Sequence, residues 1–140
     1  MATVAFCPDV DSVNPYAHAF TLIPTPFVIT PPQGEARWVT HVAAQLASTA
    51  EPLILVFVGR ASVHAPALGF SRKAVRSPAV GYYLIDPQMP TIGGEYGDWP
   101  DAPVTIVLTE DAPEYAREAA RQAHLRGWAV SPEPLEKLLT

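Results

Sequence analysis

The chain has 140 residues and a mass of 15.1 kDa, which is the size of one globular domain. Its net charge is −5 and its nine Lys and Arg residues form no stripe, which argues against nucleic-acid binding. A single cysteine excludes an intrachain disulfide and a cysteine-built zinc site, and 16 prolines, about twice the usual share, predict short and sharply interrupted elements.

The first part of the chain predicts two short strands and a helix. The strands cover residues 3–7 and 27–30, and each is followed by a proline, which stops a strand because it lacks a backbone donor. Residues 11–25 between them show little periodicity and predict a loop. A helix is predicted over 35–50, because apolar side chains recur every four positions: Trp38, Val42 and Leu46.

The middle of the chain repeats the alternation of strand and helix. Residues 53–58 are a continuous aliphatic run, which is typical of a strand covered on both faces in a parallel sheet. A weaker helix is predicted over 65–76 and a further strand over 80–85. Residues 88–103 are rich in Gly, Pro and acids and predict an irregular loop before a strand over 104–108.

The last part predicts a helix with a defined start and end. Asp111 as N-cap and Glu114 three residues later form the pattern of a capping box. Gly127 stands where a helix ends in a left-handed residue. A short strand follows over 128–130, and 134–139 predict a terminal helical turn or two.

These elements predict a single α/β domain over residues 1–140, with a mainly parallel sheet of five to six strands and helices on both faces. Sites in such folds lie at the carboxyl ends of the strands. In this chain, those ends are Cys7–Asp9, Thr30–Pro31, Gly59–Ser62, Asp86–Pro87 and Thr109–Asp111.

Residues 55–63 have the layout of a nucleophile elbow, in which a buried strand runs through a glycine into a tight turn and a helix. Three other segments follow in a matching order: Val80–Asp86 with Gln88-Met89-Pro90, Asp98–Pro103, and Ala123–Trp128. Together, over residues 35–131, they resemble the α/β-hydrolase superfamily, in particular small hydrolase-like proteins with an LVGHS-G segment. The resemblance implies a reduced α/β-hydrolase-like fold.

The chemistry of that family is not matched. Aligned on its glycine, the elbow has Ala61 where the family has its nucleophilic serine, Ser62 one residue late, and Val63 in place of the second glycine. The family histidine follows the last strand, and this chain has no histidine after His124. A carboxylate without nucleophile and base cannot perform acyl transfer.

We therefore expect a non-hydrolytic protein, a pseudo-enzyme that binds a small apolar ligand or a protein partner, as an accessory protein of a biosynthetic pathway. The alternative is a repurposed enzyme that performs acid–base chemistry, such as cyclisation, isomerisation or elimination, in the same pocket. An esterase-type hydrolase that uses the displaced Ser62 is a third hypothesis.

The candidate catalytic residues are Asp86, His64 and Cys7. Asp86 ends a strand at the crevice, or fixes its loop through an ion pair. His64 begins the helix after the elbow and could act as a general base, or is a partly buried polar residue. Cys7 ends the first strand as a thiolate beside a cation, or as a small buried hydrophobe.

The candidate ligand-binding residues surround the same strand ends: Arg60, Ala61, Ser62, Asp9, Tyr96 and Trp99. Arg60 could bind an anionic group over the helix N-terminus, or pair with Asp86 or Glu110. Ser62 could instead cap the helix, and Asp9 could make a turn. The aromatic pair in the Gly-rich loop suits a mobile lid or a cover for the core.

The sequence predicts no metal or other cofactor, since its four histidines form no ligand pair. We expect a cytoplasmic protein, because no basic leader is visible and no apolar run approaches the ~20 residues of a membrane span. Its low charge content suits burial of a face in a homodimer or another homo-oligomer. Seven Arg against two Lys, with much Ala and Pro, suggest a GC-rich bacterial coding sequence.

Overall fold

The computed structural model of the chain describes residues 3–7, 27–28, 38–47, 52–76, 78–88 and 102–131. They form a six-stranded sheet in the order β2-β1-β3-β4-β5-β6, with every neighbouring pair parallel. The predicted α/β class and parallel sheet are confirmed. The strands are β1 (Thr3–Cys7), β2 (Phe27–Val28), β3 (Leu53–Val58), β4 (Gly81–Ile85), β5 (Val104–Val107) and β6 (Ala129–Ser131).

The strand order contains one reversal of direction. The chain moves from β1 outward to β2, then returns past β1 to β3 and continues to β6 at the other edge. The carboxyl ends of β1 and β3 therefore flank the topological switch point, where α/β sheets open a crevice. Cys7 is paired in register with Phe57, so β1 ends beside the last residues of β3.

Three α-helices follow the strands: α2 (Trp38–Leu46), α3 (Ala65–Ala74) and α4 (Glu114–Ala123). Two 3₁₀ segments extend them, η2 (Gly59–His64) before α3 and η4 (His124–Arg126) after α4. None of the described helices is long and apolar enough to cross a membrane. The helix expected over 65–76 is thus continuous with a tighter first segment that starts directly at the end of β3.

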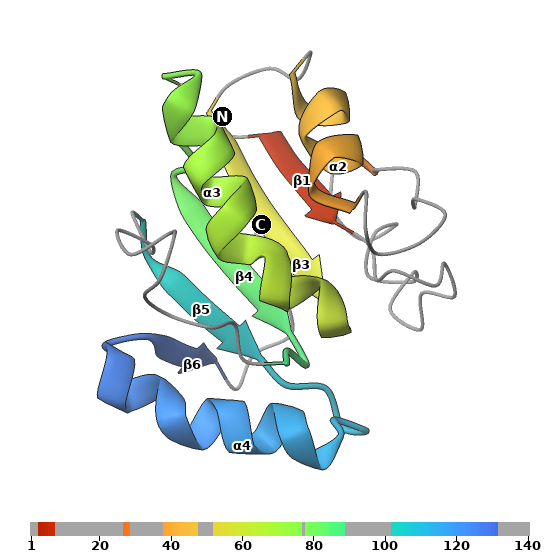
Figure 1. The fold of residues 1–140 in the computed structure, drawn as a ribbon. Helices are drawn as coiled ribbons and strands as arrows, with labels where there is room; N and C mark the ends of the chain where they lie inside the picture. Colours follow the sequence, from red (N-terminus) through yellow and green to blue (C-terminus); the bar gives the residue numbers. More distant parts are fainter. Residues whose placement is uncertain are drawn as a thin grey trace.

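The core lies between one face of the sheet and these helices. Side chains that alternate along β3 and β4, such as Leu55, Phe57 and Tyr82, point to the same face, and the rings of Phe57 and Tyr82 stack with centroids 6.5 Å apart. All three helices contribute to this cluster through Val42, Leu46, Ala65, Leu68 and Ala123. Figure 1 shows α2 and α3 side by side over β1, β3 and β4.

The opposite face of the sheet is also buried, through Val56, Val58, Ile85 and Val107. The three described α-helices pack on the first face. From β2 onward, every connection between consecutive strands runs in the same direction along the sheet. Right-handed connections that run in one direction place their helices on the same face. The expectation of helices on both faces is therefore met for one face among the described residues, and the helical turn predicted over 134–139 lies outside them.

The start of α4 differs from the expected capping box. The residue before the helix is Pro113, with φ −68° and ψ 161°, and no side chain caps the first turn. Asp111 lies in a turn in which Ala112 N donates to Thr109 O at 3.2 Å. Proline suits a helix start, because its φ is already fixed and its missing donor is not needed there. The left-handed end at Gly127 is confirmed, with φ +75°.

Candidate functional site

The turn between β3 and η2 is formed by a glycine in a left-handed conformation. Val58 is still extended, with φ −113° and ψ 127°, whereas Gly59 has φ +59°. An L-residue with a Cβ is strained at such a φ, and glycine is not. A nucleophile elbow carries its reactive residue on a sharp, strained turn between strand and helix. Gly59 is the residue that forms this turn, directly after the last residue of β3.

Ala61, which the sequence places at the nucleophile position, lies two residues after this turn. Ala61 lies two residues into η2, is fully buried, and belongs to the same core cluster as Ala65 and Leu68. The side chain of Ala61 packs against the core instead of facing a ligand.

Ser62 is fully buried, and its Oγ has no hydrogen-bond partner in the described part of the chain. The helix-capping role expected for it is wrong, since neither η2 nor α3 has a side-chain cap and the N-cap residues are Val58 and His64. The hydroxyl of Ser62 is therefore shielded from solvent.

Asp86 ends β4 and holds the neighbouring loop. It is fully buried, and its φ of +45° is also left-handed. Its carboxylate accepts two hydrogen bonds from Thr109, from the backbone N at 2.9 Å and from Oγ1 at 2.5 Å. Its own backbone N donates to Val107 O at 3.0 Å. Asp86 thus clamps the end of β4 to the segment that follows β5.

The same turn is tied to the elbow. Gln88 N donates to Gly59 O at 3.4 Å, and Pro87, which lies between Asp86 and Gln88 in the sequence, is buried. The two left-handed residues, Gly59 and Asp86, therefore stand at the carboxyl ends of adjacent strands in one hydrogen-bonded unit. We call Gly59, Asp86, Gln88 and Thr109 the strand-end cluster.

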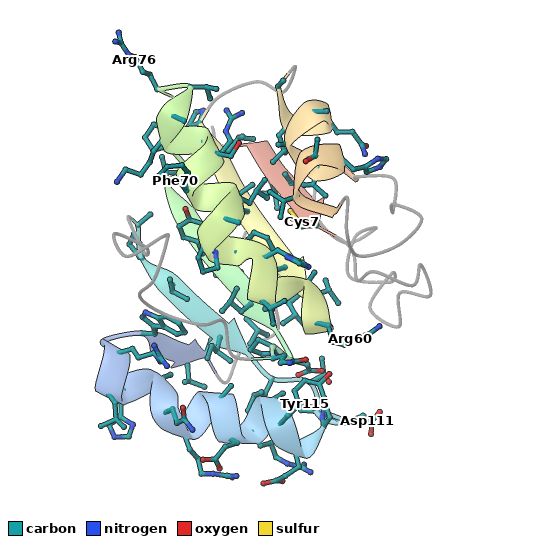
Figure 2. All side chains as sticks on the ribbon, in the orientation of Figure 1. Cys7, Arg60, Phe70, Arg76, Asp111 and Tyr115 are labelled. Carbon is teal, nitrogen blue, oxygen red and sulfur yellow. The ribbon has the colours of Figure 1, made fainter. Side chains whose placement is uncertain are left out.

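Arg60 and His64 lie on η2, beside this cluster. Arg60 is exposed and follows Gly59 directly, and Figure 2 shows its side chain near the end of β3, pointing away from the body of the protein. His64 is half-buried at the last position of η2, five residues after the left-handed turn. A cation is therefore exposed at the rim of the switch point.

Cys7 does not provide a reactive thiolate. It is fully buried at the end of β1, its Sγ lies 4.0 Å from Ala5 O, and burial raises the pKa of the thiol far above its ordinary value. A buried thiol without a nearby cation to stabilise the thiolate is inert. Of the two roles that the sequence left open for Cys7, the small buried hydrophobic residue is the one that its burial supports.

The structure brings Arg60, Ser62, His64 and Asp86 to one end of the sheet and leaves Cys7 in the core. The remaining predicted site residues, Asp9, Tyr96 and Trp99, lie outside the described residues. In the ranges that the structure describes, no group of three His, Cys, Asp or Glu side chains could hold a metal ion.

Sequence reasoning missed the roles of two residues. Thr109 was placed at a strand end by the topology rule, but its bonds to Asp86 join residues 23 positions apart and leave no local pattern. Gly59 had a usable signal: it is the first glycine after the aliphatic run, and glycine is the residue that accepts a left-handed turn without strain.

No family model and no curated protein matches this sequence. A solved structure with a similar fold is that of a protein from Pectobacterium atrosepticum named as a candidate YdeN-like hydrolase. The TM-score is 0.65 at 14% sequence identity, over 93% of this chain and 75% of that chain. At this identity the likeness is one of fold, and it supports the hydrolase-like architecture expected from the sequence.

Proposed function

We propose that this chain is a hydrolase-fold protein that works by binding and not by acyl transfer. The observation that carries the proposal is Gly59 at the left-handed turn between β3 and η2. Covalent acyl transfer needs a hydroxyl or thiol at that position, activated by a neighbouring base. Glycine offers neither group.

The polar residues around the turn support the same conclusion. Ser62 is buried within η2, and His64 lies on the same helical segment, so neither faces the other across the crevice as a nucleophile and its base would. The carboxylate of Asp86 already accepts two bonds from Thr109. A triad needs its carboxylate on the histidine, where it orients the ring.

A protein partner fits this site better than a small apolar ligand. The floor of the strand-end cluster is closed, because Gly59, Asp86 and Pro87 are buried, while Arg60 and Gln88 at the rim are exposed. An exposed arginine beside a rigid, buried floor is typical of a contact residue in protein interfaces.

Ester turnover tests the non-hydrolytic half of the proposal. With p-nitrophenyl butyrate, we expect the wild-type protein and the Ser62→Ala variant to release nitrophenol at the uncatalysed rate. A saturable rate in the wild type that Ser62→Ala abolishes would establish the displaced-serine hydrolase in its place.

Native mass spectrometry tests the binding half. Protein purified from its own source without denaturation should carry an additional mass, which Arg60→Glu removes while circular dichroism stays unchanged. A co-purifying small molecule would favour the apolar ligand over the partner. A bare monomer in every preparation would contradict the binding role.

One observation favours acid–base catalysis as a second candidate function. Asp86 is a non-glycine residue held at φ +45°, and such strained residues gather at functional sites. If Asp86 is a catalytic base, Asp86→Asn and His64→Gln should each abolish conversion of the natural substrate in extracts, while Thr109→Val, which loosens the clamp, should reduce it less. Wild-type conversion by both Asp86→Asn and His64→Gln would reject this candidate.

A further inference from the structure

The exposed apolar side chains of the described residues gather at the end of α3. Phe70, Val75 and Val80 are 54%, 62% and 50% exposed, and they make up half of the large hydrophobic side chains that are exposed in this part of the chain. They fall within one short stretch, the last turns of α3 and its connection to β4. A concentration of exposed apolar surface marks an interaction site more often than scattered residues do.

Two cations stand among these side chains. Lys73 and Arg76 are exposed, and Figure 2 shows Arg76 and Phe70 at the same end of α3. We call Phe70, Lys73, Val75, Arg76 and Val80 the basic end. An apolar centre with arginine and an aromatic ring is the composition of a protein-binding surface.

The backbone conformation of Arg76 is a second feature of the basic end. Arg76 has φ +61°, directly after the C-cap of α3, where glycine or asparagine is usually found because a Cβ is strained. Strain that the fold itself does not require is retained where a side chain has a function. The fold alone would be better served by glycine at this position.

The complementary surface lies at the other end of the same molecule. Glu110 and Asp111 are exposed before α4, and the ring of Tyr115 is 46% exposed in its first turn. Figure 2 shows Asp111 and Tyr115 together, at the opposite end of the protein from Phe70 and Arg76. We call Glu110, Asp111 and Tyr115 the acidic end.

We infer that the protein self-associates head to tail, with the basic end of one copy on the acidic end of the next. The two surfaces match in charge, two cations against two carboxylates, and in an aromatic component on each side. Because they lie at opposite ends, one molecule cannot join them by itself, and the contact forms between different surfaces of two copies. Salt weakens the association, since exposed charges carry part of it.

Charge reversal of each end tests the inference by sedimentation velocity at low salt. The double variants Lys73→Glu/Arg76→Glu and Glu110→Lys/Asp111→Lys should each weaken self-association about tenfold or more, because each brings like charges together. An equimolar mixture of the two should associate again, since each reversed end then meets its opposite. Arg126→Glu, a reversal away from both ends, is the control and should associate as the wild type does.

Arg76→Gly separates contact from folding. This variant relieves the left-handed strain, so its thermal midpoint should rise, while its self-association should weaken. A general loss of structure cannot produce that combination.

Three results would overturn the inference: a wild-type protein that stays monomeric at low salt, reversed variants that associate unchanged, or a mixture that fails to recover association. A symmetric dimer that survives both reversals would place the interface elsewhere. Binding of the basic end to a different acidic protein, without self-association, would replace the second copy as its occupant.

Discussion

Gly59, the residue that forms the turn after β3, has no side chain that could react. Gly59 forms a sharp left-handed turn between strand and helix, with φ +59°, and its side chain is a single hydrogen. We propose that this turn corresponds to the nucleophile elbow of the hydrolase fold. The hydroxyl of Ser62 is buried in η2, which follows the turn, and the thiol of Cys7 is buried in the core. Two residues that suggest nucleophilic chemistry in the sequence, Ser62 and Cys7, are thus buried in the fold.

Glycine substitutions test the conformation of the turn. Gly59→Ala should lower the free energy of unfolding by about 1–2 kcal/mol, the cost of an L-residue at positive φ. Gly127→Ala should lose about 1 kcal/mol from backbone strain alone, since a Cβ there meets nothing within 4 Å at φ +75°. Gly81→Ala is the matched control, with open space and no positive φ, and should be neutral. Urea denaturation measures all three, and equal stability of the Gly59 and Gly81 variants would refute the left-handed turn.

The clamp between Asp86 and Thr109 gives a second expected stability change. Thr109→Val removes the hydroxyl that donates to the buried carboxylate at 2.5 Å but keeps the shape of the side chain. We expect a loss of about 1–3 kcal/mol, because a buried acceptor loses its partner. Thr105→Val, the same substitution at a half-buried position on β5, is the control for chemical denaturation. Equal effects of the two substitutions would show that the clamp does not stabilise the fold.

The reactivity of Cys7 follows from its burial. Because burial raises the pKa of the thiol, the thiolate should be absent even at a pH of about 9, where an ordinary cysteine is largely ionised. Ellman's reagent should therefore react with the protein only in denaturant. Stoichiometric reaction of the native protein at that pH would show that Cys7 is accessible and would reopen its catalytic role.

At the scale of elements, apolar runs bounded by proline or glycine were enough to locate the strands. The predicted bounds of 3–7 and 53–58 are those of β1 and β3, since a buried strand needs a continuous apolar segment and its flanks break the ladder. The predicted start of α4 at Asp111 was wrong, because the helix begins after Pro113. The fixed φ of a proline favours a helix start without any side-chain cap. Glu114 is consequently available to the arginines of its own helix.

The exposed face of α4 carries an ionic network that can be measured directly. Arg121 donates to Glu114 and Glu118, each at 2.6 Å, and these bonds lower the pKa of both carboxyl groups. A carboxyl group whose pKa is lower in the folded state than in the unfolded state stabilises the fold at pH values above its unfolded-state pKa. This contribution is lost as the pH falls through the folded-state pKa, so the network stabilises the fold at neutral pH and not in acid. Arg121→Gln should raise both pKa values in an NMR titration, with little change in overall stability because all three groups are exposed. Unchanged pKa values would contradict the network.

At the scale of the whole molecule, the sheet order explains why the site lies where it does. The reversal between β1 and β3 places the elbow at the switch point, and the register of parallel strands brings Asp86 beside it. The sequence predicted this arrangement through the topology rule. It could not supply the contact of Asp86 with Thr109, because the two residues lie 23 positions apart and meet only in the folded sheet.

Intact-mass spectrometry after treatment with a fluorophosphonate probe tests the central claim most directly. Such probes form a covalent adduct only with an activated hydroxyl, and Gly59 provides none at the elbow. The native protein should keep its unmodified mass after prolonged incubation, and a serine hydrolase treated in parallel should be fully labelled. A stoichiometric adduct on the native chain, located to Ser62 or to any other serine, would contradict the account.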